Sequence, residues 1–287
     1  MKLFRYSASG RTGLGLIRPG HDDQFIDLAQ LEASLPAEMT PFYDPATAKR
    51  VAGLLAKATD FKPLSSVRFE LPIAHPQKIV CLGLNYADHA KEGGHARPEY
   101  PSFFMRVDTS LVAHNDAIVR PKVSTKLDYE AELAVIIGKP ARHLTPDNAL
   151  DCVFGYSCFN DGSVRDYQRK TNQWTIGKNF DATGGFGPWI VTADEVPAGG
   201  HGLRIQSILN GQVMQDANTS DFLWNVKESL VIISECLTLM PGDVIITGTP
   251  AGVGYARTPP VFMKQGDICD IVIEGVGTLR NTIRDEA

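Results

Sequence analysis

The chain has 287 residues, of which 43% are hydrophobic and 21% charged, and its formal net charge is -5. The length is sufficient for one large domain or for a large and a small one, and the negative charge, without a basic stripe interleaved with aromatic residues, argues against nucleic-acid binding. The apolar runs fall short of the ~20 residues that a membrane helix needs, and the first residues lack the apolar segment of a signal peptide. We therefore expect a cytoplasmic protein without a membrane partner.

Residues 1–72 are predicted to form a small N-terminal α+β domain. Two short strands are expected in KLFRYS and GLGLIR, joined by the turn ASGRTG. A helical stretch is expected to begin in FIDLAQLEASL, and DPATAKRVAGLLAKA carries apolar residues at helical spacing. The segment ELPIAHPQ contains two prolines, which is typical of a linker.

Residues 73–287 are predicted to form a mostly β (α+β) catalytic domain. Runs such as KIVCLGLN, GPWIVTA and GDVIITGTP are rich in β-branched residues, and turn signals such as NG, PGD and QGD separate them. Helices are expected only at residues 87–92, 146–152 and 223–239. This pattern lacks the regular alternation of strands and helices that a doubly wound sheet requires.

The segment LDYEAELAVIIGK places two glutamates in an apolar run. If residues 127–137 form one strand, Glu130 and Glu132 lie on the same face, with their Cα atoms roughly 6.5 Å apart. Two carboxylates this close repel each other when both are ionised, so a buried pair needs a proton or a cation. The alternative is an edge strand whose acidic face is exposed to water, which would show the same sequence pattern.

A third acidic residue, Asp161, follows the apolar run GYSCFN. If a helix begins at Ser163, Arg165 and Gln168 lie near each other on it, beside that carboxylate. Asp161 could equally be a turn or N-cap residue. Three carboxylates without a nearby pair of His or Cys favour an ion with oxygen ligands, and Mg²⁺ or Mn²⁺ fits better than zinc.

Three further segments carry candidate residues. His89 and Glu92 are three residues apart, so they would be neighbours on a short helix, and the EGG that follows predicts an ordering lid over residues 85–97. Arg106, in FFMR, could reach the far end of a substrate or be a surface residue. GTPAGVG lacks the GK[ST] ending of a phosphate loop, so we expect a tight turn whose backbone donors face a carboxylate.

Taken together, these motifs resemble the fumarylacetoacetate hydrolase (FAH) family, in particular its short bacterial-type members of the acylpyruvase or fumarylpyruvate hydrolase kind. The resemblance covers residues 78–283, and residues 1–70 resemble the small N-terminal domain of many members. It implies an FAH-type mixed β-roll, usually in a homodimer. It also implies one Mg²⁺ or Mn²⁺ per subunit, held by Glu130, Glu132 and Asp161.

The resemblance further implies roles for single residues. His89 and Glu92 match a dyad that activates water, and Lys178 matches a lysine near the metal and the substrate. The substrate-binding positions of the family match Arg165, Gln168 and Thr249, the last at the substrate's carboxylate end. The extra aspartate ligand of the large eukaryotic enzymes is missing here.

The expected reaction is metal-dependent hydrolysis of a C–C bond in a β-diketo acid of the acylpyruvate or fumarylpyruvate type. The metal and Lys178 would stabilise a pyruvate enolate, while His89, oriented by Glu92, would take a proton from water. An oxaloacetate decarboxylase would need the same enolate but no attacking water. An isomerase or hydratase of aromatic catabolism, acting on hydroxymuconate-type diacids, would use the dyad only to move protons. A scaffold with a relic site is the non-enzymatic alternative, against which the intact set of residues argues.

Overall fold

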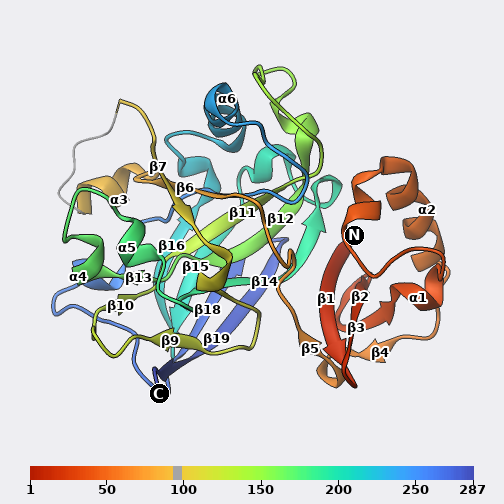
Figure 1. Ribbon diagram of the computed structural model, residues 1–287, viewed down its shortest axis with the longest axis horizontal. Coiled ribbons are helices and arrows are strands. Elements are labelled where there is room, and N and C mark those ends of the chain that lie inside the picture. Colours follow the sequence, from red (N-terminus) through yellow and green to blue (C-terminus); the bar gives the residue numbers. More distant parts are fainter. Residues whose placement is uncertain (93–98) are drawn as a thin grey trace.

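The computed structural model describes residues 1–92 and 99–287, and these are folded mainly as strands with few helices (Figure 1). The predicted mostly β class is confirmed. Within the described residues, no helix is long and apolar enough to cross a membrane.

A mixed sheet of twelve strands, counted over the described residues, forms the larger layer. Its continuous path runs through β4 (Lys62–Pro63), β3 (His21–Asp27), β2 (Arg11–Arg18), β1 (Lys2–Ala8), β14 (Gly184–Thr192), β12 (Val153–Asn160), β11 (Ala131–Ile137), β17 (Val244–Ile246), β6 (Ile79–Gly83) and β7 (Ser102–Arg106). Two strands lie off this path, β5 (Arg68–Phe69) beside β1 and β8 (Leu111–Val112) beside β14.

A second sheet packs against the first and closes the roll. Its strands are, in spatial order, β16 (Gln212–Asn218), β15 (Arg204–Leu209), β18 (Ile268–Ile273), β19 (Gly277–Asp285) and β9 (Ile118–Arg120). Leu133 and Val135 of β11 share one buried cluster with Ile205 of β15, Ile271 of β18 and Leu279 of β19. The core therefore lies between the two sheets, where burial of apolar side chains stabilises both layers.

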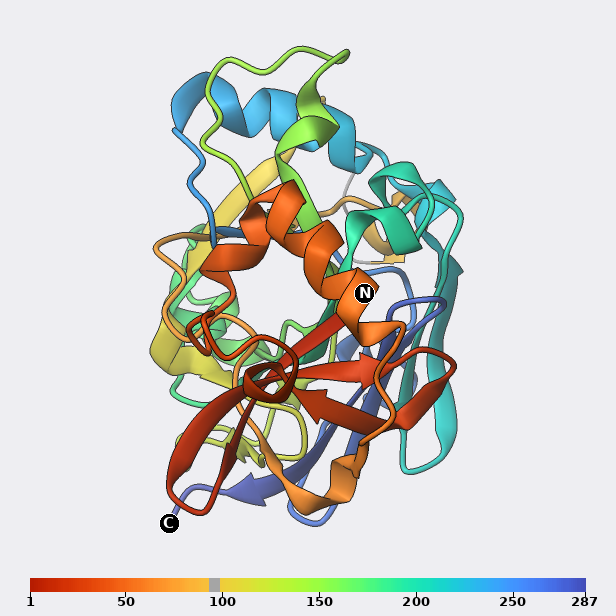
Figure 2. The ribbon, with the colours of Figure 1, turned by 90° about the vertical axis from the view of Figure 1, so that its right-hand side faces the viewer.

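The N-terminal strands extend the main sheet, because β1 pairs antiparallel with β14 and places Leu3 opposite Ile190. Figure 2 faces this region, with helix α2 (Pro45–Leu55) lying above the strands. The segment FID ends strand β3 instead of starting a helix. The short helix α1 (Leu28–Leu31) begins only after it, where the Asp27 carboxylate caps the Ala29 N–H. The domain division at residue 72 stays a prediction.

The helices after residue 72 differ in length from those expected. Helix α3 (Ala87–Glu92) has the predicted bounds, and α6 (Val226–Cys236) lies within the predicted range because Asn225 and Glu228 form a capping box there. Residues 146–152 contain only a 3-10 turn, Ala149–Cys152. The short helices α4 (Arg165–Gln168) and α5 (Thr175–Lys178) lie with α3 on the side of the roll away from the N-terminal strands (Figure 1).

Candidate active site

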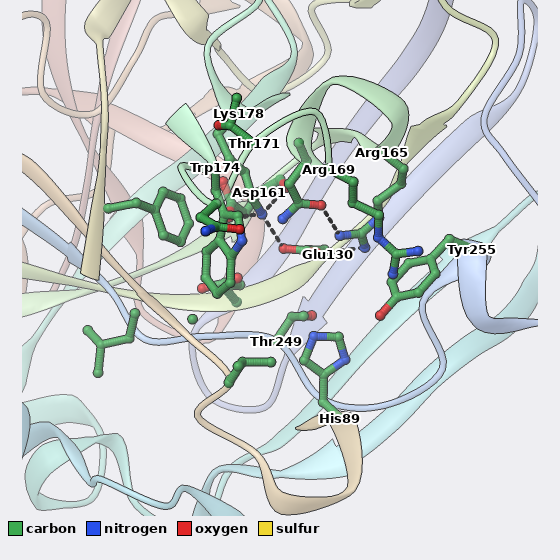
Figure 3. A pocket seen from close by; sticks show the side chains of 17 residues that line it. His89, Glu130, Asp161, Arg165, Arg169, Thr171, Trp174, Lys178, Thr249 and Tyr255 are labelled. Carbon is green, nitrogen blue, oxygen red and sulfur yellow. Dashed lines mark hydrogen bonds and ion pairs between the residues drawn. The ribbon is translucent and has the colours of Figure 1, made fainter. Parts of the chain in front are cut away.

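A pocket of about 500 Å³ opens between helices α3, α4 and α5 (Figure 3). Its floor is made by carboxylates at the ends of central strands. Its walls come from the segment after β6, the two short helices and the loop after β17. The residues that line it are Leu82, Gly83, Leu84, His89, Phe104, Glu130, Glu132, Asp161, Arg165, Gln168, Arg169, Thr171, Asn172, Trp174, Lys178, Thr249 and Tyr255.

The expected single strand over residues 127–137 is interrupted. Strand β10 (Leu127–Asp128) pairs with β13 (Ser163–Val164), whereas β11 pairs with β12 and β17, so the chain changes partners at Tyr129 and Glu130. Strand β11 is also buried on both faces. The assumed alternation of an apolar and an acidic face is therefore wrong, and Glu130 lies in the break between the strands.

This break brings the three predicted carboxylates together. The antiparallel register of β11 and β12 sets Ala131 opposite Asn160, and the Asp161 N–H donates to the Glu130 carbonyl (2.9 Å). One oxygen each of Glu130, Glu132 and Asp161 lies within 4.8 Å of the others, and all three side chains are buried.

Two buried cations neutralise part of this cluster. The Lys178 ammonium lies 2.6 Å from Glu130 Oε2 and 2.5 Å from Asp161 Oδ2. Arg106 donates from Nη1 to Asp161 Oδ1 (2.6 Å), from Nε to Ser110 and from Nη2 to Thr183. The suggested substrate contact of Arg106 is corrected by this geometry, because the guanidinium is buried behind Asp161 and does not line the pocket.

Arg165 is the third buried cation. Its Nε donates to Asp128 Oδ2 (2.8 Å), its Nη1 donates to Gln168 Oε1 (2.9 Å), and its Nη2 lies 2.6 Å from Glu130 Oε1. The predicted closeness of Arg165 and Gln168 on one helix is confirmed. The Arg165 guanidinium thus interacts mainly with side chains of the protein itself.

The electrostatics of the two glutamates are opposite. Burial by itself would raise the pKa of Glu130, but Lys178 and Arg165 outweigh it and lower that pKa to about 2. Burial raises the pKa of Glu132 well above its ordinary value, and the nearby Asp161 and Glu130 raise it further. Burial would lower the pKa of Lys178, yet Asp161 and Glu130 raise it, so the amine stays protonated.

The residues present fit a divalent cation. With Asp128, the site has four buried carboxyl groups and three buried cations, Arg106, Arg165 and Lys178. Among the described residues, Glu132 is the one carboxyl of the four that forms no ion pair with these cations. Carboxylate oxygens are the preferred ligands of Mg²⁺ and Mn²⁺. An added positive charge would oppose the effect of Asp161 and Glu130, which add to burial in raising the pKa of Glu132.

The predicted dyad lies on another wall of the pocket. His89 is mostly buried, and its Nδ1 lies 3.5 Å from Glu92 Oε2 without a hydrogen bond to any described residue. The Glu92 carboxylate accepts the Gly252 N–H at 3.0 and 3.2 Å. Of the predicted lid, residues 93–97 lie outside the described residues.

The loop after β17 explains the glycine-rich motif. Backbone N–H groups of residues 248–255 donate to carboxylates, as expected, but these belong to the protein. Gly248 donates to Glu132 (2.5 Å), Gly252 to Glu92, and Gly254 and Tyr255 to Asp128 (2.8 and 3.0 Å). Gly252 has a φ of 103°, which side-chain-bearing residues rarely adopt.

Thr249 lines the pocket, as predicted for a substrate-binding residue. Its Oγ1 donates to the Ala131 carbonyl (3.0 Å) and accepts from Gln215 (2.8 Å). The hydroxyl proton is therefore already used within the protein. A substrate contact of Thr249 would need the remaining lone pair, the methyl group or a change of partners.

Sequence reasoning missed several lining residues. Arg169 and Tyr255 meet on one side of the pocket, and Trp174 lies on the other, with Glu130 between them (Figure 3). Arg169 directly follows Gln168, so its place at the end of helix α4 was a usable signal. The position of Tyr255 depends on the fold of a distant loop, which no local pattern reveals.

A β-roll whose pocket combines buried carboxylates, a buried lysine and a His–Glu pair has the composition of an acid–base active site. Residues 78–284 match the family described as "Fumarylacetoacetate (FAA) hydrolase C-terminal". The chain therefore belongs to the fumarylacetoacetate hydrolase family.

Individual relatives cover nearly the whole chain. The Bos taurus protein named "Oxaloacetate tautomerase FAHD2A, mitochondrial" is 39% identical, over 99% of this chain and 91% of its own length. The fumarylacetoacetate hydrolase of the psychrophile Exiguobacterium antarcticum has a TM-score of 0.84 at 35% identity, and a maleylpyruvate hydrolase from Sphingobium has 0.80 at 30%, each over 100% of both chains.

These relatives are named as enzymes of different reaction classes. Family membership therefore indicates an enzyme with a divalent-metal site without deciding between hydrolysis and isomerisation. The bovine relative is named mitochondrial. For this chain, a cytoplasmic location and a homodimer stay predictions.

Proposed function

We propose that the protein is a tautomerase that interconverts the keto and enol forms of a dicarboxylic 2-oxo acid of the oxaloacetate type. The observation that carries this proposal is a base and a charge-stabilising centre lining one pocket, His89 beside Glu92 and Lys178 among three carboxylates. The choice of tautomerisation is supported by the oxaloacetate tautomerase that is 39% identical over almost the full chain.

The metal site of this proposal consists of Glu130, Glu132 and Asp161. A divalent cation bound there would polarise the 2-oxo group of the acid. Arg106 and Lys178 hold the Asp161 carboxylate from two sides, at 2.6 and 2.5 Å, so it is already oriented before any ligand arrives.

The protein's own groups would then move the proton. His89 removes a proton from C3 of the keto acid, or returns it there, and Glu92 stabilises the imidazolium that forms. Because Nδ1 is turned towards Glu92, the other ring nitrogen is the one available to the substrate. The Lys178 ammonium stabilises negative charge on the 2-oxygen, whose proton exchanges with water.

C–C bond hydrolysis is the second candidate. The same His89 and Glu92 could activate a water molecule, and the maleylpyruvate hydrolase from Sphingobium has this fold at 30% identity. Decarboxylation of oxaloacetate is the lyase alternative, since it passes through the same enolate without either a water or a base.

The test separates the three reactions with one preparation. Metal-stripped protein, before and after addition of Mg²⁺ or Mn²⁺, is mixed with enol oxaloacetate, and the loss of enol absorbance is followed together with pyruvate release. Acetylpyruvate and maleylpyruvate serve as hydrolase substrates. We expect metal-dependent loss of the enol with little pyruvate, and a much slower reaction for His89→Gln.

Other outcomes would replace the proposal. Pyruvate released from acetylpyruvate or maleylpyruvate, without acceleration of the enol–keto exchange, would establish the hydrolase. Pyruvate released from oxaloacetate at full rate by His89→Gln would establish the decarboxylase.

A further inference from the structure

The pocket contains one arginine whose charge the described protein does not neutralise. Arg169 follows helix α4, its side chain is exposed at the pocket, and among the described residues no carboxylate lies within ion-pair distance of its guanidinium. Arg165, one helical turn earlier, is engaged by Asp128, Gln168 and Glu130. Of these two cations, only Arg169 is available to an anion that enters the pocket.

The Arg169 guanidinium is also held in place. Its Cζ lies 4.2 Å from the centroid of the Tyr255 ring, and Arg165 Cζ lies 4.4 Å from the same centroid. The Tyr255 N–H donates to Asp128 Oδ2 (3.0 Å), which fixes the backbone that carries the ring. Stacking on a fixed aromatic ring orients a guanidinium and reduces the entropy lost when it binds a ligand.

The two sides of the pocket differ in character, with Arg169 on one side and the Trp174 ring on the other. Figure 3 places Arg169 and Tyr255 together, away from Trp174, and the ring of Trp174 packs edge-on against Phe104 at 5.7 Å. A negatively charged part of a substrate would therefore be drawn towards Arg169, and an apolar part towards Trp174. A guanidinium binds a carboxylate with two parallel hydrogen bonds, which gives selectivity as well as affinity.

We propose that Arg169, stacked on Tyr255, binds the distal carboxylate of the substrate and thereby selects dicarboxylic over monocarboxylic 2-oxo acids. This inference rests on the proposed function for the placement of the oxo-acid end at Glu130, Glu132 and Asp161. It assigns the other end of the substrate to a residue outside the acid–base machinery.

The test compares the binding of two acids that differ by one carboxylate, oxaloacetate and pyruvate. Calorimetry is performed on Mg²⁺-loaded protein carrying His89→Gln, so that turnover does not disturb the titration. Arg169→Gln is expected to weaken oxaloacetate binding about ten- to hundredfold, the range of one charge-assisted hydrogen bond, and to leave pyruvate binding within about twofold. Added salt should reduce the difference between the two acids.

Lys170→Gln is the matched control. It removes a positive charge from the next residue, whose ammonium lies over the Tyr167 ring at 3.4 Å and does not line the pocket. We expect it to change neither affinity. Equal weakening of both acids by Arg169→Gln, no weakening of either, or failure of the parent protein to bind either acid would each overturn the inference.

The design separates this inference from the proposed reaction. If the protein fails to accelerate enol–keto exchange while Arg169→Gln still weakens oxaloacetate binding more than pyruvate binding, that result would overturn the tautomerase and support the role of Arg169. Accelerated enol–keto exchange, with Arg169→Gln affecting the binding of both acids equally, would overturn the role of Arg169 alone.

Discussion

Most of the charged side chains on the inner wall of the pocket, where the carboxylates lie, are ion-paired, whereas those on the outer wall are only partly paired. On the inner wall, Glu130, Asp161 and Lys178 are buried and ion-paired at 2.5–2.6 Å, and Arg106 pairs with Asp161 from behind the wall. On the outer wall, within the described chain, His89 Nδ1 lies near Glu92 without a hydrogen bond, and Arg169 has no carboxylate partner. Buried pairs are costly to break, whereas partly paired groups can change partners during a reaction. The inner wall should therefore control folding and metal binding, and the outer wall rate and selectivity.

Removal of the lysine would break the inner wall most severely. Lys178→Met leaves Glu130 and Asp161 without their shared cation, so we expect the metal-free protein to lose about 3–5 kcal/mol of unfolding free energy. Activity should fall by at least about 10²–10³-fold, because the charge that stabilises the enolate is lost. Urea denaturation and the enol assay measure both effects. Lys170→Met is the control, and equal stability of the two variants would contradict the prediction.

Replacement of the base should affect the outer wall in the opposite way. His89→Gln is expected to lower kcat about 10²–10⁴-fold, the usual contribution of a general base. Because Nδ1 makes no hydrogen bond among the described residues, unfolding free energy should change by less than about 1 kcal/mol. A large loss of stability with retained activity would place His89 in the scaffold instead.

The two glutamates offer a finer comparison within the inner wall. Burial and the neighbouring carboxylates raise the pKa of Glu132, so Glu132→Gln removes a disfavoured charge and should leave the metal-free protein no less stable. Its Mg²⁺ affinity should fall by at least about 100-fold, since even partners of metal ligands contribute 10–100-fold. Glu130→Gln, which removes the partner of Lys178 and Arg165, should destabilise the protein. Denaturation and metal titration of both variants test this contrast.

The smallest effect is expected far from the pocket, at His114. Burial and then the positive charge of Arg280 lower the pKa of His114 from 6.5 to about 4, only partly opposed by Asp270. Between these values the unfolded chain binds a proton that the folded chain does not. Stability is therefore lost as pH falls from about 6.5 to about 4, on the order of 1–2 kcal/mol for this partly exposed ring.

His114→Gln should reduce that loss. The neutral amide does not titrate and can still accept the Arg280 N–H, which His114 Nδ1 accepts at 3.0 Å. Unfolding free energies of both proteins, measured at a series of pH values, provide the test. Identical pH profiles would show that His114 does not contribute.

The sequence predicted those parts of the site that are close in the chain or belong to the family motif. Arg165 and Gln168 could be placed because helical spacing determines their contact, and Asp161 because it ends an apolar strand. The role of Arg106 could not be predicted, because the packing of β7 decides whether its side chain lies in the pocket or behind Asp161. The break at Tyr129 and Glu130 was missed because it arises from a change of strand partners, which apolar alternation does not record.

The loop of residues 248–255 has a consequence for how activity is lost on heating. Its main-chain N–H groups hold Glu132, Glu92 and Asp128, which belong to the metal site, the dyad and the support of Arg165. Local opening of this one segment would release all three carboxylates together. Thermal inactivation is therefore expected as a single step below the global melting temperature, and hydrogen exchange of the loop amides should follow it.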